Sequence, residues 1–227
     1  MFITFEGIEG CGKTTQIQII TKNLKEKGFS VISTKEPGGG GDFSLGIRHL
    51  LKSTADSLLL SELLAIYAAR NEHIKKVIQP EAESNIIISD RYLDSSFAYY
   101  LYNSLKNESG KIIKTDEYFR RYEQILKLNE IIDIVYPDIT VFFDISAQTA
   151  QDRANTRNGA LVDKYDNLGK DNMSLIQYVY DELYTGIKNN SLKEFPPRSV
   201  FKVDAGRSVE EVSASILGYV TPLIKTK

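Results

Sequence analysis

The chain has 227 residues, 42% of them hydrophobic and 26% charged, which suits one globular domain over residues 1–227 that needs no disulfide or metal for stability. Its net charge of −2 and pI of about 5.8 argue against broad nucleic-acid binding, so no nucleic acid is expected among its partners. The single cysteine, Cys11, excludes an intramolecular disulfide and fits a cytoplasmic location. No apolar stretch approaches the roughly 20 residues that span a membrane.

Short apolar runs alternate with helical patterns along the chain. The runs predict five strands, at residues 2–6, 30–35, 85–89, 139–144 and 199–203. The clearest helical pattern covers residues 60–79, with apolar side chains at three- and four-residue spacing: Leu60, Leu63, Leu64, Tyr67, Ile74 and Ile78. Strands that are apolar throughout and alternate with helices predict an α/β fold, a five-stranded parallel sheet with helices on both faces. Residues 103–116 are polar and are expected to form a surface excursion.

The segment GIEGCGKT, residues 7–14, matches the phosphate-binding pattern G-x-x-x-x-G-K-[ST]. It directly follows a predicted strand and opens a helix, which is the context that this motif requires. Its glycines allow backbone N–H groups to surround a phosphate at a helix N-terminus. Lys13 would reach the β- and γ-phosphates of a nucleotide, and the Thr14 hydroxyl would bind Mg²⁺. The motif therefore predicts a P-loop NTPase fold.

Asp90 and Arg91 follow the third predicted strand. An aspartate at the end of a strand beside a P-loop can orient the Mg²⁺ shell, and an adjacent arginine can neutralise phosphate charge. This pair suits transfer between two phosphates better than hydrolysis by water. The guanine-recognition string N-K-x-D of GTPases is absent.

Six segments resemble thymidylate kinase (dTMP kinase), in that family's order and at similar spacing. They read FEGIEGCGKTTQ, KEPGGG, IRHLL, LLAIYAARNEH, SDRYLDSSFAY and YPDITVFFDI. The resemblance implies ATP- and Mg²⁺-dependent phosphorylation of dTMP to dTDP, usually by a homodimer. It also implies an acceptor-binding region at about residues 36–105 and a short lid at about residues 158–172.

The resemblance assigns two sets of residues on the ATP side. The nucleotide-binding set is Gly7, Ile8, Glu9, Gly10, Cys11, Gly12, Lys13, Thr14, Thr15, Arg153, Arg157, Asp204 and Ala205. The catalytic set is Lys13, Asp90, Arg91, Arg153 and Lys164, with Thr14 and Asp90 as the metal-binding residues.

On the acceptor side, the resemblance assigns contacts to the phosphate, sugar and base of dTMP. These residues are Glu9, Glu36, Pro37, Arg48, Ile66, Arg70, Arg91, Ser95, Ser96, Tyr99 and Tyr100. A tyrosine ring at Tyr99 could exclude a ribose hydroxyl and so favour deoxynucleotides. His73 is expected to be a surface or capping residue of its helix, and Phe97 and Tyr102 are expected in the core.

Three positions depart from the family pattern. Ile66 stands where the family places an aromatic platform for thymine, Tyr100 replaces a frequent glutamine, and Lys164 replaces a lid arginine. Ile66 and Tyr100 leave open a kinase of the same fold acting on another deoxynucleotide such as dUMP. A second alternative, from a different class, is a catalytically weak nucleotide-binding protein with a regulatory role, against which the set Lys13, Thr14, Asp90 and Arg91 argues.

Overall fold

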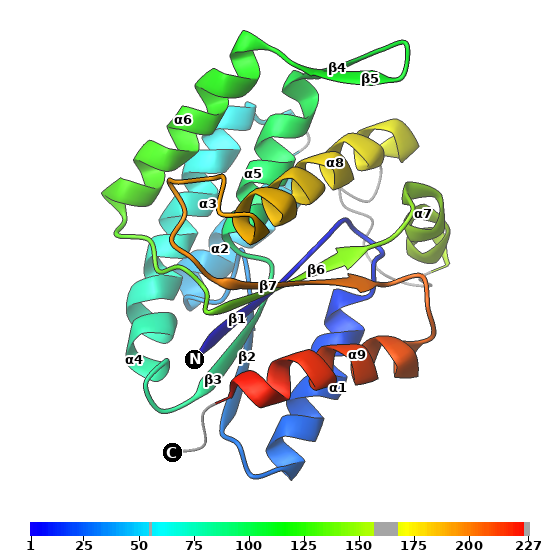
Figure 1. Cartoon of the computed structure of the whole chain (residues 1–227). Coiled ribbons are helices and arrows are strands. Elements are labelled where there is room, and N and C mark those ends of the chain that lie inside the picture. Colours follow the sequence, from blue (N-terminus) through cyan, green and yellow to red (C-terminus); the bar gives the residue numbers. More distant parts are fainter. Residues whose placement is uncertain (55, 157–167, 225–227) are drawn as a thin grey trace.

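The computed structural model describes residues 1–54, 56–156 and 168–224. At its centre lies a five-stranded sheet in the order β2-β3-β1-β6-β7, with every neighbouring pair parallel (Figure 1). The strands are β1 (Phe2–Glu6), β2 (Val31–Lys35), β3 (Ile86–Asp90), β6 (Ile139–Asp144) and β7 (Ser199–Asp204). All five predicted strands and the parallel sheet are confirmed.

Helices cover both faces of this sheet (Figure 1). On one face lie α1 (Lys13–Glu26) and α9 (Val209–Val220), which contact each other; on the other lie α5 (Leu93–Leu101) and α8 (Gly169–Lys188). The remaining helices are α2 (Asp42–Ser53), α3 (Leu59–His73), α4 (Gln79–Glu81), α6 (Asp116–Ile131) and α7 (Ala147–Asn155). Within the described ranges, no helix is long and apolar enough to cross a bilayer.

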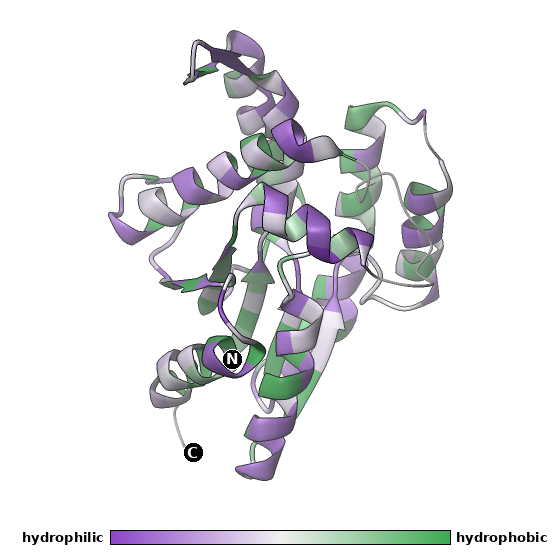
Figure 2. Cartoon of the chain, turned by 90° about the vertical axis from the view of Figure 1, so that its right-hand side faces the viewer, coloured by the Kyte–Doolittle hydropathy of each residue, from purple (hydrophilic) through white to green (hydrophobic). Residues whose placement is uncertain are grey.

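The core is formed where the helices press against the strands. Ile3, Phe5, Ile87, Ile88 and Val141 have no exposed surface, because strands in the middle of a parallel sheet are covered on both faces. Figure 2 shows this pattern as apolar central strands surrounded by helices with hydrophilic outer sides.

The carboxyl ends of the strands meet at one edge of the sheet and bring acidic residues together. Phe5 of β1 pairs with Asp90 of β3, and Asp144 of β6 pairs with Asp204 of β7. In parallel α/β sheets, ligands bind outside this edge. The phosphate loop, which follows Glu6, begins at the same edge.

Two segments show detail that the sequence did not predict. The excursion at residues 103–116 contains a hairpin, β4 (Leu105–Glu108) and β5 (Lys111–Lys114), which projects from the helices and is largely hydrophilic (Figures 1 and 2). It was missed because its residues lack a clear alternation of apolar and polar side chains. The turn between its strands places Ser109 and Gly110 at positive φ, 52° and 83°, as a two-residue hairpin turn requires.

The predicted helix at residues 60–79 is present, but it is not regular throughout. It continues from α3 as a π-helical turn at Ile74–Ile78 and then as α4. Leu60 and Leu64, two of the apolar residues at helical spacing, are 42% and 49% exposed. Most of the expected lid, residues 158–167, lies outside the described residues, and its last residues, 169–172, belong to the first turn of α8.

Candidate active site

The phosphate loop curls tightly between β1 and α1. Gly10 and Gly12 have φ values of +82° and +94°, which favour glycine. A Cβ atom on Gly10 would lie 2.1 Å from the backbone oxygen of Ala150 on α7. The loop therefore needs glycine at Gly10 for two reasons, its backbone conformation and its close approach to α7.

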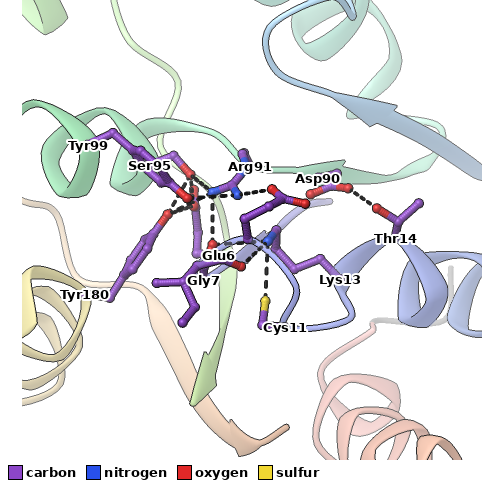
Figure 3. Close-up of polar contacts among 12 residues, drawn as sticks. Glu6, Gly7, Cys11, Lys13, Thr14, Asp90, Arg91, Ser95, Tyr99 and Tyr180 are labelled. Carbon is purple, nitrogen blue, oxygen red and sulfur yellow. Dashed lines mark hydrogen bonds and ion pairs between the residues drawn. The ribbon is translucent and has the colours of Figure 1, made fainter. Parts of the chain in front are cut away.

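Lys13 is buried beneath this loop. Its Nζ donates to the carbonyl oxygens of Gly7 (3.1 Å) and Ile8 (3.0 Å) and contacts Cys11 Sγ at 3.3 Å (Figure 3). Burial and the Arg91 charge work against the ammonium ion, but Cys11 together with nearby carboxylates leaves the pKa of Lys13 raised. The lysine therefore remains charged, as binding a polyphosphate requires.

Thr14 and Asp90 meet at the mouth of the loop. The Thr14 hydroxyl donates to Asp90 Oδ2 at 2.7 Å, joining the start of α1 to the end of β3 (Figure 3). Both side chains offer oxygen ligands, which Mg²⁺ prefers, and Mg²⁺ in kinases is held by one or two such groups together with phosphate oxygens and water. Among the described residues no cluster of three or more His, Cys, Asp or Glu could hold a metal. The donors present therefore suit Mg²⁺ shared with a nucleotide.

Arg91 joins the phosphate loop to the helix that follows β3. Its Nη1 donates to Gly7 O (2.9 Å), and its Nη2 donates to Glu9 Oε2 (2.9 Å) and Tyr99 OH (3.1 Å). Its backbone has a φ of +69°, a conformation uncommon in residues other than glycine and worth noting at a binding site. Its guanidinium lies 4.9 Å from the centre of the Tyr99 ring.

A cavity of about 310 Å³ opens beside Arg91. All eleven residues predicted on the acceptor side line it: Glu9, Glu36, Pro37, Arg48, Ile66, Arg70, Arg91, Ser95, Ser96, Tyr99 and Tyr100. The structure thus brings together side chains that are spread from residue 9 to residue 100. The cavity has basic groups for a phosphate and an apolar wall that includes Leu59, Leu63 and Ile66.

One wall of the cavity is held by a buried ionic network. Glu36 Oε2 accepts from Arg70 Nε at 2.7 Å, and Glu36 Oε1 lies 2.8 Å from His73 Nδ1. The other ring nitrogen of His73 lies 2.9 Å from Thr34 Oγ1. The expectation that His73 lies on the helix surface is therefore wrong, because His73 has no exposed surface. Its ring joins α3 to Thr34 of β2 and to Glu36, which follows β2.

The same network orients Arg70 toward the cavity. Arg70 Nη2 donates to the backbone oxygen of Tyr92 and to Ser96 Oγ, both at 2.9 Å. Its buried Nη1 has no hydrogen-bond partner among the described residues. Arg70 lines the cavity, although its side chain is only 1% exposed.

The other residues around the cavity fall into different environments. Arg48 Nη1 donates to Pro37 O at 2.9 Å, and Ser95 Oγ donates to Glu6 Oε2 at 2.6 Å. The Tyr100 hydroxyl donates to Gln124 Oε1 at 2.7 Å, so this polar end points toward α6. Phe97 is fully buried, as expected, but Tyr102 is only half-buried and lines the cavity.

The predicted adenine side lies at the ends of β6 and β7. Arg153 of α7 donates to Ala205 O at 2.7 Å, and Ala205 N donates to Asp144 O at 2.8 Å. Asp204 Oδ1 accepts from Gly206 N at 3.0 Å. The structure thus places Arg153, Asp204 and Ala205 together, whereas Arg157 and Lys164 lie outside the described residues.

Glu6 and Tyr180 were missed by sequence reasoning, although both contact the predicted site. Glu6 has no exposed surface and accepts from Tyr92 N (2.8 Å) as well as from Ser95. Burial and the neighbouring Asp94 charge raise its pKa to about 7. A charged residue at the last position of a buried strand could have predicted that Glu6 belongs to the site. Tyr180, on a distant helix, carried none.

A glycine-rich phosphate loop, a hydroxyl–carboxylate pair and a second cavity joined to the loop by an arginine define a P-loop protein with room for two ligands. The thymidylate kinase family profile matches residues 5–216. Relatives named thymidylate kinase come from Mycoplasma capricolum subsp. capricolum (33% identical over 215 residues, 93% of this chain and 90% of the relative) and Acinetobacter baumannii (34% over 224 residues, 97% and 100%). A third, from Exiguobacterium sp., is 32% identical over 225 residues, 96% of this chain and 93% of the relative.

The chain belongs to the thymidylate kinase family, and the resemblance seen in its sequence is confirmed. The family is one of phosphotransferases, so the expected enzyme class is confirmed as well.

Proposed function

We propose that this protein transfers the γ-phosphate of ATP to dTMP and releases dTDP and ADP. The observation that carries the proposal is the position of Arg91, which donates to the phosphate loop at Gly7 and also lines the cavity. An arginine in this position can neutralise two polyanionic ligands where they meet.

On the donor side, residues 7–15 would hold the phosphates of ATP, with Lys13 at the β- and γ-phosphates. Thr14 and Asp90 would hold Mg²⁺, which would neutralise phosphate charge. Arg153, Asp204 and Ala205 would contact the adenine, together with Arg157. Arg153 and Lys164 are the proposed cations contributed from the lid side.

On the acceptor side, Arg48 and Arg91 would hold the phosphate of dTMP. Arg70, which lines the cavity, would contact the base. Ser95, Ser96 and Tyr99 would surround the nucleoside. An oxygen of the dTMP phosphate is already anionic, so its attack on the γ-phosphate needs no strong general base, and catalysis rests on positioning and charge neutralisation.

The organisation of the chain follows from these roles. One domain, residues 1–227, would contain an acceptor-binding region at about residues 36–105. A lid at about residues 158–172 would exclude water that otherwise hydrolyses ATP.

A panel of acceptors tests the assignment. ADP release would be measured with dTMP, dUMP, dCMP, dGMP and the corresponding ribonucleotides, at equal concentrations with ATP and Mg²⁺. We expect dTMP to have the highest kcat/KM. Equal or better turnover of dUMP would favour the alternative acceptor, which Ile66 motivates by replacing an aromatic ring with an aliphatic wall. ATP binding without transfer to any acceptor would favour the regulatory alternative.

The role of Lys13 can be tested separately. We expect Lys13→Ala to lower kcat by at least about a hundredfold, because it removes a charged donor from the transferring phosphate. Lys22→Ala is the matched control, since Lys22 is on the same helix with its side chain 76% exposed. Full transferase activity in Lys13→Ala would contradict the proposed phosphate cradle.

A homodimer is part of the proposal. Phe43 and Leu50 of α2 are 56% and 58% exposed, and Leu60 and Leu64 of α3 are also exposed. Helices α2 and α3 pack against each other, so these side chains offer apolar surface that a second copy could cover. Light scattering should give a dimer for the protein and a monomer for the double variant Leu50→Glu/Leu64→Glu, whereas Leu223→Glu should remain dimeric. A monomeric wild type would contradict this.

We also propose a cytoplasmic location, which is supported by the lone Cys11 and by the requirement for ATP. Fractionation of cells that produce the chain would test it, and recovery outside the cytoplasm would contradict it.

A further inference from the structure

Tyr180 lies on α8, far along the chain from the phosphate loop, and its side chain is 1% exposed. Its hydroxyl lies 2.8 Å from Ser95 Oγ, 3.3 Å from Arg91 Nη1 and 3.4 Å from Glu6 Oε2 (Figure 3). Arg91 Nη1 also lies 3.3 Å from Ser95 Oγ. Two hydroxyl oxygens therefore face the same guanidinium nitrogen.

The available hydrogen atoms determine the direction of these bonds. Ser95 donates its one hydroxyl hydrogen to Glu6 Oε2 at 2.6 Å. In the short contact between the two hydroxyls, Tyr180 must then be the donor. The chain of bonds runs from Tyr180 to Ser95 to the Glu6 carboxylate, which leaves lone pairs on both hydroxyl oxygens facing the donor Arg91.

We propose that Tyr180 is a positioning residue for phosphoryl transfer, because its hydroxyl, with Ser95 and Glu6, fixes the orientation of the Arg91 guanidinium at the phosphate loop. The inference rests on the proposed function through the role given there to Arg91. A guanidinium held by oriented acceptors needs no reorganisation when phosphate charge develops beside it.

The neighbouring residue Tyr184 supplies a matched control. Both tyrosines project from α8 against Phe142, with ring centres 6.2 Å (Tyr180) and 5.8 Å (Tyr184) from the Phe142 ring. The Tyr184 hydroxyl instead accepts from Lys188 Nζ at 3.1 Å. Tyr180→Phe and Tyr184→Phe therefore remove the same atom from two tyrosines that contact the same ring, one buried and one partly buried, but only the first removes a contact to Arg91.

Steady-state kinetics with ATP and dTMP give the first readout. We expect Tyr180→Phe to lower kcat by about tenfold to a hundredfold, the range for losing a hydrogen bond to a charged group. The KM values for ATP and dTMP should change less than about threefold, because Arg91 keeps its charge and its contacts to Gly7, Glu9 and Tyr99, and only its alignment with the transition state is lost. Tyr184→Phe should match the wild type. A kcat within about twofold of the wild type for Tyr180→Phe would overturn the inference.

A second readout does not depend on catalysis. In ¹⁵N-labelled protein, the Nη signals of Arg91, assigned by their loss in Arg91→Lys, should be resolved because a held guanidinium rotates slowly. In Tyr180→Phe they should merge or broaden, and in Tyr184→Phe they should stay resolved. Unchanged Arg91 signals in Tyr180→Phe would overturn the inference, whether or not the wild type phosphorylates dTMP. Failure of the wild type to phosphorylate dTMP would overturn only the proposed function.

A double-variant cycle distinguishes orientation of Arg91 from general destabilisation. If Tyr180 acts through Ser95, then Tyr180→Phe should lower kcat much less in a Ser95→Ala background than in the wild type. Equal fold-losses in both backgrounds would contradict the proposed chain of hydrogen bonds.

Discussion

The buried Glu36 carboxylate provides the sharpest stability prediction. Its two oxygens contact Arg70 Nε at 2.7 Å and His73 Nδ1 at 2.8 Å, and the Arg70 and Glu36 side chains are 1% and 4% exposed. Glu36→Gln keeps the size of the side chain and removes its charge. The amide oxygen can still accept from Arg70, and the amide N–H can donate to His73 Nδ1 if that imidazole shifts its proton to Nε2. Thr34, beside Nε2, can then accept this proton because a hydroxyl both donates and accepts.

The substitution therefore preserves the number of hydrogen bonds and isolates the charge. It leaves the buried Arg70 cation without its carboxylate. Breaking a buried pair in this way costs about 3–5 kcal/mol in the free energy of unfolding. Urea unfolding followed by circular dichroism, with the slope m compared between variants, measures this loss. We also expect weaker dTMP binding, because Arg70 is then less firmly oriented toward the cavity.

Glu117→Gln is the matched control. Glu117 also contacts two cationic side chains, Arg120 at 2.6 Å and Arg121 at 2.7 Å, but on the exposed surface of α6. Solvent screens such pairs, so we expect a much smaller loss of stability. If Glu36→Gln lowers the free energy of unfolding no more than Glu117→Gln does, with equal m values, then the buried charge of Arg70 does not have the predicted cost.

Three further predictions concern the strand end, the base wall and the phosphate loop. Burial raises the pKa of Glu6 from 4.5 to about 7, so between these pH values the folded state binds a proton that the unfolded state has lost. The free energy of unfolding should therefore fall by about 3 kcal/mol as pH rises from 4.5 to 7. Urea titrations of Glu6→Gln at several pH values should lack this fall. Ile66→Phe should lower the dissociation constant for dTMP about twofold to tenfold in calorimetry, since ring stacking is worth about 0.5–1.5 kcal/mol. Gly10→Ala should abolish ATP binding, since its Cβ would lie 2.1 Å from Ala150 O.

Each of these has an outcome that would contradict it. An equal fall in stability with pH in wild type and Glu6→Gln would show that Glu6 is not the group that titrates. Unchanged or weaker dTMP binding in Ile66→Phe would show that the base does not lie against this wall. Gly28→Ala is the control for Gly10→Ala, because Gly28 has a similar φ of +87° but nothing within 4 Å of its Cβ position. Equal loss of ATP binding in both variants would contradict the explanation by a clash with Ala150.

The sequence by itself determined the sheet and its phosphate loop. A buried parallel strand is apolar throughout, so β1, β3 and β6 were readable as continuous runs, and the loop is specified by glycines at set spacing before Lys13 and Thr14. The same local reasoning failed for the β4–β5 hairpin, whose polar strands carry no such pattern.

Only the tertiary structure decided how the side chains of different elements combine. Nothing local to His73 shows that it reaches Glu36 and Thr34, because those contacts form only when α3 packs beside the end of β2. The same is true of Tyr180, which reaches Glu6 and Ser95 from a helix more than 80 residues away in the chain. Periodicity reports which face of an element is buried, whereas the hydrogen-bond partner of a buried polar group depends on which elements pack together.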